Sequence, residues 1–360
     1  MELFVCLCGI LCFFGVLTVS KKRISRKETI KFFVFISFAC LLIISGCRAL
    51  DVGTDTPMFV RYFEKLKGFE SMGIQSGRFE IGFRFFCCLI AHFFTDAHAM
   101  LFLSAFLTLV LLYLAFWSAS ENAVYSILMF IALNYYYNSM CLTRQYIAVA
   151  LCCLGITFLM QKKRVAFVVL VVLGGLFHTT AFLVLFLLLF SILPYRKNQR
   201  YWYLLLGVLC TIGFSGLVTV FIRLLPGYEV YLYSENFYLV GKLGSIIRAV
   251  ISGLLYLLYN ILYTRYGDNS EASKISFFTG MFAFFITLVS VQGAILSRIA
   301  TYFNIFFCIS IPNALSWLPD RNRKYLVATS VLIGSFAYSF WILAFRPEWA
   351  GILPYHFWNA

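Results

Sequence analysis

The stretch Arg48-Ala-Leu-Asp-Val-Gly-Thr-Asp-Thr-Pro57 follows a long apolar run and places one arginine and two aspartates within a few positions. Arg48 and Asp51 are three residues apart, so on a last helical turn they would share one face. Gly53 can adopt the left-handed conformation that ends helices, and the closing proline suits the start of the next helix. Asp55 is therefore expected in a tight turn between two helices, beside other charges at a membrane edge.

The composition excludes a soluble domain. Of the 360 residues, 62% are hydrophobic and only 12% are charged, and the mean hydropathy is +0.88. That length suffices for about a dozen membrane crossings of roughly 20 residues each. The net charge of +14 would suggest nucleic acid in a soluble protein. Here the lysines and arginines lie mostly in short loops, where they orient helices and meet anionic lipid, so we expect a bilayer partner and no nucleic acid.

Charge in the short loops predicts an all-α polytopic membrane protein with 12 crossings and both termini outside. An apolar run at 81–94 is short for a span, and we expect it to be re-entrant or interfacial. The expected spans are 3–19, 30–47, 98–117, 123–137, 145–160, two arms within 165–193, 201–222, 246–265, 275–294, 299–316 and 325–344. The whole chain, 1–360, is expected to form a single integral-membrane domain.

This topology gathers the polar groups on the external face, formed by loops 48–97, 138–145 and 223–245 and the tail 345–360. None of the fifteen acidic residues falls in the middle of an expected span. Ion-coupled transporters commonly need such a group at mid-membrane, so its absence argues against that class. The charged residues and histidine expected on this face are Arg48, Asp51, Asp55, Glu80, Arg84, Arg144, His178 and Arg298, with Arg223, Lys242 and Arg248 flanking the long outer loop.

Several outward arginines beside carboxylates suit a phosphorylated ligand. Arginine binds phosphate and pyrophosphate with two parallel hydrogen bonds, and a nearby carboxylate can accept a proton from an attacking hydroxyl. The simpler interpretation is that arginines at helix ends are membrane anchors and that His178 satisfies backbone groups at a turn. The twelve cysteines lie mostly in apolar runs without metal-ligand spacing, so neither a metal nor a cofactor is expected.

An ordered set of fragments resembles one family. They are Arg48…Asp51-Val-Gly-Thr-Asp-Thr56, Glu80-Ile-Gly-Phe83, Thr143-Arg-Gln-Tyr-Ile-Ala148, Phe177-His-Thr-Thr-Ala181, Ser297-Arg-Ile-Ala-Thr-Tyr302 and Leu353-Pro-Tyr-His-Phe357. From about residue 30 to the C-terminus the chain resembles the EpsG family of Wzy-like bacterial exopolysaccharide and O-antigen polymerases. Met58-Phe59 departs from the family pattern, which has a tyrosine after the Gly-Thr-Asp turn, and Tyr62 is the residue that could replace it.

The resemblance implies a glycosyltransferase of GT-C-like architecture in the cytoplasmic membrane, with its active face external or periplasmic. It would join oligosaccharide repeat units carried on undecaprenyl pyrophosphate into capsular polysaccharide, exopolysaccharide or O-antigen. A chain-length regulator is a further partner that the resemblance suggests.

Combining the residues with the resemblance assigns roles. Asp55 is expected to be the general base on the acceptor hydroxyl, with Asp51 and Glu80 the next candidates. Arg48, Arg144 and Arg298 are expected to hold the donor pyrophosphate, and His178 to donate to the same group. Gln145 and Tyr302, which neighbour two of these residues in the motifs, are expected to complete the substrate site.

Two other functions stay open at this point. A flippase for lipid-linked oligosaccharide would share the basic cavity and the many spans. A membrane O-acyltransferase that decorates surface polysaccharide would need a histidine–carboxylate pair, for which His178 is the available centre.

Overall fold

A computed structural model describes residues 23–74, 78–192, 200–224, 242–291 and 295–358, and these residues are predominantly helical. The helices are α2 (Arg23–Gly46), α3 (Thr56–Phe63), η1 (Phe69–Ser71), α4 (Ile81–Phe93), α5 (Ala97–Ala119), α6 (Ala123–Ala132), α7 (Tyr135–Cys141), α8 (Thr143–Met160), α9 (Arg164–Phe177), η2 (Thr179–Leu185), α10 (Phe186–Ile192), α11 (Arg200–Leu224), α14 (Lys242–Tyr266), α15 (Glu271–Val289), α16 (Ile295–Asn304), α17 (Phe307–Ser316), α18 (Arg321–Phe345) and η4 (Pro347–Trp349). Within the described ranges the only β-type pairing is an isolated bridge between Arg48 and Phe357. The all-α prediction is confirmed for this part of the chain.

Seven helical stretches in the described part of the chain, one of them formed by α16 and α17 together, are long and apolar enough to cross a membrane. They span Glu28–Gly46, Ala97–Ala119, Thr143–Met160, Leu243–Tyr266, Glu271–Val289, Leu296–Ser316 and Arg321–Phe345. Several apolar helices, including α4, α6 and α9, are shorter than such a span. The predicted first span, 3–19, lies outside the described residues, so the total of 12 crossings stays a prediction.

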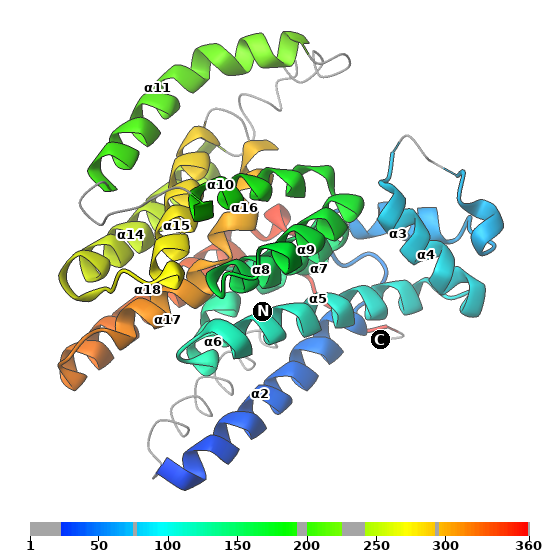
Figure 1. The fold of residues 1–360 in the computed structure, drawn as a ribbon. Coiled ribbons are helices and arrows are strands. Elements are labelled where there is room, and N and C mark those ends of the chain that lie inside the picture. The colour runs from blue at the N-terminus through cyan, green and yellow to red at the C-terminus, as the bar shows by residue number, and fades with distance from the viewer. Residues whose placement is uncertain (1–22, 75–77, 193–199, 225–241, 292–294, 359–360) are drawn as a thin grey trace.

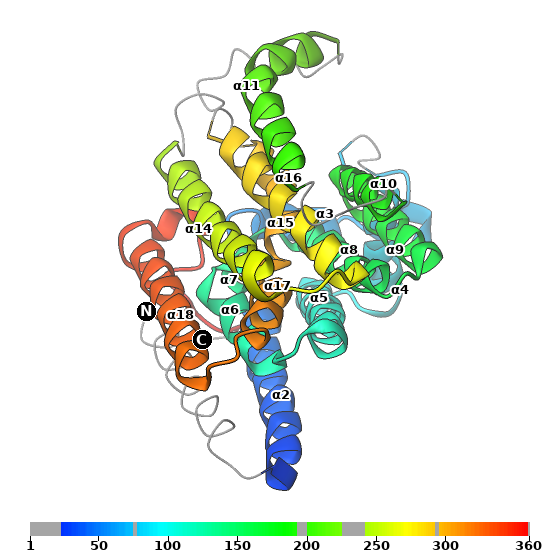
Figure 2. The same cartoon turned by 60° about the vertical axis from the view of Figure 1, so that its left-hand side comes forward.

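Helix α8 occupies the centre of the bundle, with α5 and α9 packed against it (Figure 1). In the most apolar window of α8, 83% of the residues are buried, against 22% in α18 at the periphery. Figure 2 shows α11 at one edge of the bundle and α2 extending from the opposite edge. The most buried of the seven candidate spans therefore carries the Thr143-Arg-Gln motif at its first turn, which places that motif at one end of the core.

Several helices are interrupted where the sequence favoured continuous spans. The predicted span 123–137 is wrong in detail, because α6 ends at Ala132 and Asn134 adopts a left-handed conformation with φ of 64°. The predicted loop 138–145 is wrong as well, since α7 and α8 are helical on either side of Leu142. Interrupted helices in membrane proteins place free backbone groups beside ligand sites.

The hairpin predicted within 165–193 is present, with its turn at His178. Its two ends meet where Arg164 Nη2 donates to the Ser191 carbonyl oxygen at 3.1 Å. Glycine allows the arms to pack closely, since a Cβ on Gly175 would lie 2.3 Å from Cζ of Phe182. Each arm is shorter than a full membrane span. The position of His178 is therefore set by the packing of the two short arms against each other.

The C-terminal tail runs along the polar stretch that begins at Arg48. Backbone amides of Gly53 and Thr54 donate to the carbonyls of Gly351 and Ala350 at 2.7 and 3.2 Å. The predicted shared face of Arg48 and Asp51 is wrong, because α2 ends at Gly46 and Arg48 is already extended backbone in a bridge. Gly53 does have a positive φ, of 105°, but it lies inside the loop, away from any helix end.

The helix expected to start at the closing proline is present as α3, with Pro57 in its first turn. Phe59, Tyr62 and Phe63 are buried in a second apolar cluster with residues of α4 and α5, while Arg61 is exposed. The polar loop, residues 47–55 between α2 and α3, is thus held by the tail, and α3 is held by this cluster. The following loop contains η1, and residues 75–77 lie outside the description.

Candidate functional site

The first turns of three helices and the turn of the hairpin lie close together, and each contributes a polar side chain to the space between them. Glu80 is the residue before α4, Arg144 is the second residue of α8, and Asp55 is the residue before α3. His178 occupies the turn between α9 and η2. Helix starts carry unpaired N–H groups and a partial positive charge, so their convergence favours anions in the space between them.

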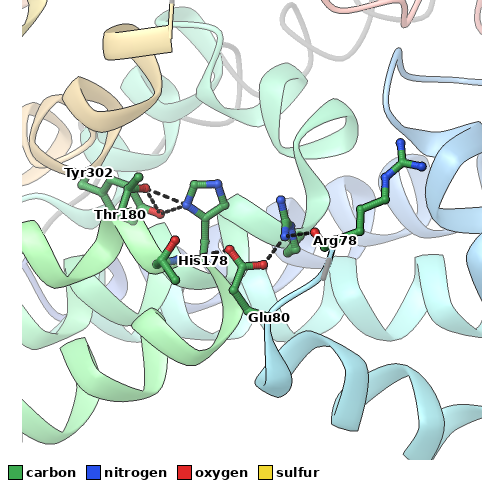
Figure 3. A network of polar contacts seen from close by, with 7 residues as sticks. Arg78, Glu80, His178, Thr180 and Tyr302 are labelled. Atoms are coloured by element: carbon green, nitrogen blue, oxygen red, sulfur yellow. Dashed lines mark hydrogen bonds and ion pairs between the residues drawn. The ribbon is translucent and has the colours of Figure 1, made fainter. Parts of the chain in front are cut away.

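Glu80 links two of these helix starts (Figure 3). Its Oε2 atom pairs with Nη1 of Arg144, and its Oε1 atom accepts a hydrogen bond from the backbone N–H of Thr179 at 3.2 Å. Both ionic side chains are only 17% exposed. The guanidinium of Arg144 also lies 5.4 Å from the ring centroid of Phe79. Arg144 is therefore held in one orientation by a charge partner and an aromatic ring.

His178 sits beside this pair and is bonded to hydroxyl groups. Its Nδ1 atom lies 2.6 Å from Oγ1 of Thr180 and 3.0 Å from the hydroxyl of Tyr302, as Figure 3 shows. Burial, with the charges of Arg144 and Arg298 adding to it, lowers the pKa of His178 to about 3. The ring is therefore neutral at physiological pH. When Nδ1 accepts a hydrogen bond from either hydroxyl, the ring proton is on Nε2 and available to an anionic ligand.

Arg298 and Asp55 form a looser pair at the same place. Nη2 of Arg298 lies 3.9 Å from Oδ2 of Asp55, and their side chains are 47% and 29% exposed. Gln145 Nε2 donates to the Arg298 backbone carbonyl at 2.6 Å, which ties α16 to the start of α8. The Oε1 atom of Gln145 is buried without a hydrogen-bond partner. A long contact and partial exposure leave both charged groups able to bind a ligand.

Arg48 is placed differently from its prediction as a pyrophosphate contact. Its side chain is 1% exposed and donates to the carbonyl oxygens of Ser45, Val52 and Met140. Those bonds connect the end of α2, the loop at Val52 and the end of α7, and so hold the polar loop against these two helices. Arg48 thus ties the loop to the neighbouring helices through backbone carbonyls, and its role as a pyrophosphate contact stays a prediction.

Asp51 is also separated from the cluster. Its carboxylate Oδ1 lies 3.0 Å from Nε2 of His356 in the C-terminal tail, and its side chain is 69% exposed. The tail side of the loop therefore carries Asp51, while Asp55, at the start of α3, meets Arg298. Of the residues predicted from the sequence, Asp55, Glu80, Arg144, Gln145, His178, Arg298 and Tyr302 come together.

The sequence alone did not single out Thr180, Phe79 or His356. Thr180 was quoted within a motif, and its position two residues after His178 is the signal that could have identified it as a hydroxyl partner. His356 was likewise quoted within a motif, but its partner Asp51 is distant in sequence, and Phe79 gave no signal. Among the described residues, no group of three His, Cys, Asp or Glu side chains is placed to hold a metal ion.

The cluster combines the two arginines Arg144 and Arg298, a neutral histidine and the carboxylates of Asp55 and Glu80 around helix starts. Such a set can bind a diphosphate group and accept a proton from a hydroxyl held near it. In comparisons with known proteins, the model of the EpsG family matches residues 31–357. No curated protein and no solved structure matches the chain.

Proposed function

Because this chain belongs to the EpsG family, we propose that it is a membrane glycosyltransferase that polymerises lipid-linked repeat units. The family is associated with polysaccharide polymerase activity. The donor is the growing glycan on undecaprenyl pyrophosphate, and the acceptor is a hydroxyl of the incoming lipid-linked unit. The product is a capsular polysaccharide, exopolysaccharide or O-antigen, made at the outer face of the cytoplasmic membrane.

The observation that carries this proposal is the set of Arg144, Arg298 and His178 around the starts of α4 and α8. Two guanidinium groups and one imidazole N–H can donate hydrogen bonds to the oxygens of a pyrophosphate. The backbone N–H groups at the helix starts carry partial positive charge and favour the same anion. The charge pair with Glu80 fixes Arg144 in advance, so that little ordering is needed when the ligand binds. Glu80 is therefore a positioning residue for Arg144.

Transfer follows from this arrangement. The acceptor oxygen attacks the anomeric carbon of the donor glycan, and the bond from that carbon to the pyrophosphate oxygen breaks. The electron pair stays on the leaving pyrophosphate, whose growing charge Arg144, Arg298 and the N–H of His178 stabilise. Asp55 accepts the proton of the acceptor hydroxyl, because it is the carboxylate held most loosely at the cluster.

A strain lacking this chain, compared with the same strain restored, tests the proposal. We expect the polymer ladder on a gel to collapse to single repeat units, with the lipid-linked unit accumulating on the outer leaflet. Accumulation on the inner leaflet would instead support the flippase. Unchanged chain length with lost acyl groups would support the acyltransferase, which the contacts of His178 with hydroxyls, not a carboxylate, do not favour.

A further inference from the structure

The carboxylate of Asp55 is not held in place by its own contacts. It lies 3.9 Å from Arg298, too far for a hydrogen bond, and it makes no capping hydrogen bond to α3. A general base has to lie within hydrogen-bond reach of the hydroxyl that it deprotonates, about 2.6–3.2 Å between heavy atoms. The position of Asp55 is therefore set by the residues beside it in the chain.

Both chain neighbours of Asp55 are bonded to the end of α7. Oγ1 of Thr54 lies 2.6 Å from Sγ of Cys141, and Oγ1 of Thr56 donates to the Met140 carbonyl oxygen at 3.3 Å. Met140 and Cys141 are the last two residues of α7. Thr56 and Cys141 are buried, so water competes little with these contacts. Asp55 is thus held to one helix end on both sides.

The end of α7 continues directly into the start of α8. Leu142 is the single residue between the two helices, its N–H donates to the Asn138 carbonyl at 2.8 Å, and its carbonyl accepts from the N–H of Tyr146 at 2.9 Å. Arg144 is the second residue of α8. The same hydrogen-bonded junction therefore carries Arg144 and holds the loop with Asp55.

Close packing keeps Thr54 against this junction. A Cβ on Gly53 would lie 2.9 Å from the Met140 carbonyl oxygen and 3.3 Å from Cα of Cys141, so the loop backbone lies directly on the end of α7. From the tail, a Cβ on Gly351 would lie 2.8 Å from Cγ2 of Thr54. Thr54 is therefore enclosed between the tail and α7.

We propose that Thr54, Thr56 and Cys141 are positioning residues, which hold Asp55 at a fixed separation from Arg144. The inference rests on the proposed function, in which Asp55 takes the proton of the acceptor hydroxyl while Arg144 holds the donor pyrophosphate. The oxygen that loses this proton attacks the carbon that loses the pyrophosphate, so base and guanidinium have to keep their spacing. A displacement of about 1 Å at a reacting centre can cost about 10²-fold in rate.

The test uses the full-length protein in lipid nanodiscs and lipid-linked single units extracted from a strain lacking this chain. The rate of polymer lengthening is expressed per amount of folded protein. Thr56→Val, which removes the hydroxyl at nearly constant shape, should lower the maximal rate about tenfold. The concentration of single units at half-maximal rate should stay within about twofold, because Asp55 acts on the transferred proton. Thr56→Ser, which keeps the hydroxyl, should retain most of the rate.

The contact between Thr54 and Cys141 is tested in the same assay. Thr54→Val and Cys141→Ala should each lower the maximal rate, and the double variant should be no slower than the slower single variant, because both changes break one contact. Thr157→Val is the matched control for Thr56→Val. Thr157 is also 0% exposed and donates to the Leu154 carbonyl at 2.7 Å, far along α8 from the site, so its loss should leave the maximal rate unchanged.

Combination with Asp55→Asn separates positioning from a general structural effect. A positioning residue acts only through the group that it positions, so adding Thr56→Val to Asp55→Asn should lower the rate by no more than about twofold. A further tenfold loss in that background would overturn the inference, as would wild-type maximal rates in both Thr54→Val and Thr56→Val. If wild-type protein makes no polymer from these units, the proposed function itself is wrong and this inference is lost with it.

Discussion

Asp55 and Asp51 lie four residues apart in one loop, yet they have different surroundings. Asp55 precedes α3 and faces Arg298, whereas Asp51 is exposed and pairs with His356 of the tail. A base that acts on a bound hydroxyl must lie within reach of the ligand, and only Asp55 adjoins the cluster of arginines. The sequence ranked these carboxylates by motif position, and the structure separates them by their partners.

Asp55→Asn should lower the rate of polymer lengthening by about 10²–10⁴-fold, which is the usual loss when a positioned base is removed. The amount of protein in the membrane should stay the same, since Asp55 makes no capping hydrogen bond to α3. Asp51→Asn is the control in the same loop and should keep most of the activity. If Asp55→Asn lengthened polymer at the wild-type rate, or if Asp51→Asn were inactive, the general base would have to be another residue.

His178 should make the protein less stable in acid. Its pKa is lowered to about 3 by burial, whereas an unfolded histidine titrates near 6.5. As the pH falls below 6.5, the unfolded chain gains a proton that the folded chain does not bind, so stability decreases until about pH 3. By about pH 5 the free energy of unfolding is lower by about 2 kcal/mol than above pH 6.5.

Unfolding of the purified protein in detergent, followed at about pH 7.5 and about pH 5, measures this effect. In His178→Asn, which keeps a polar side chain but cannot titrate, the acid-dependent loss should shrink by that amount. An equal loss in wild type and variant would show that other groups cause the pH dependence.

At the scale of elements, the tail and the polar loop act as one unit. Gly53 has φ of 105°, and a Cβ there would lie 2.6 Å from Oγ1 of Thr56 and 2.9 Å from the Met140 carbonyl. Its amide also donates to Gly351 in the tail. An alanine at this position would have to adopt a strained backbone conformation and displace the loop that carries Asp55.

Gly53→Ala should therefore destabilise the protein by about 1–3 kcal/mol and lower the lengthening rate together with stability. Gly334→Ala is the control, because a Cβ there meets nothing within 4 Å and the residue is inside helix α18. That variant should be neutral or slightly stabilising. Equal behaviour of the two variants would show that the loop conformation does not matter.

The elements also show what the sequence could predict. Long apolar runs located most of the candidate spans, and the hairpin turn at His178 followed from basic residues at both ends of its run. The break at Asn134, where φ is 64°, was not predicted, and the side chain there accepts a hydrogen bond from Ser339, 205 positions away. The burial of Arg48 was missed for the same reason, since its partner Met140 is 92 positions away. Motif order identified most of the cluster, but only tertiary packing assigns each charge its partner.

At the scale of the molecule, the bundle has two unlike ends. The start of α8, the polar loop and the tail lie at one end, and Lys162 and Lys163 follow the other end of α8. Because basic residues in short loops face the cytoplasm, the end with the cluster should be external. This orientation decides whether the site can meet substrates presented on the outer leaflet.

Cysteine labelling of whole cells with a reagent that cannot cross the membrane tests the orientation. Glu348→Cys, at a tail position whose side chain is 60% exposed, should react above the background of the native cysteines. Lys162→Cys, exposed at the opposite end, should react only after the cells are opened. The described native cysteines are buried or partly buried, so their background should be low. Labelling of Lys162→Cys but not Glu348→Cys in intact cells would place the cluster on the cytoplasmic side, where it could not join units on the outer leaflet.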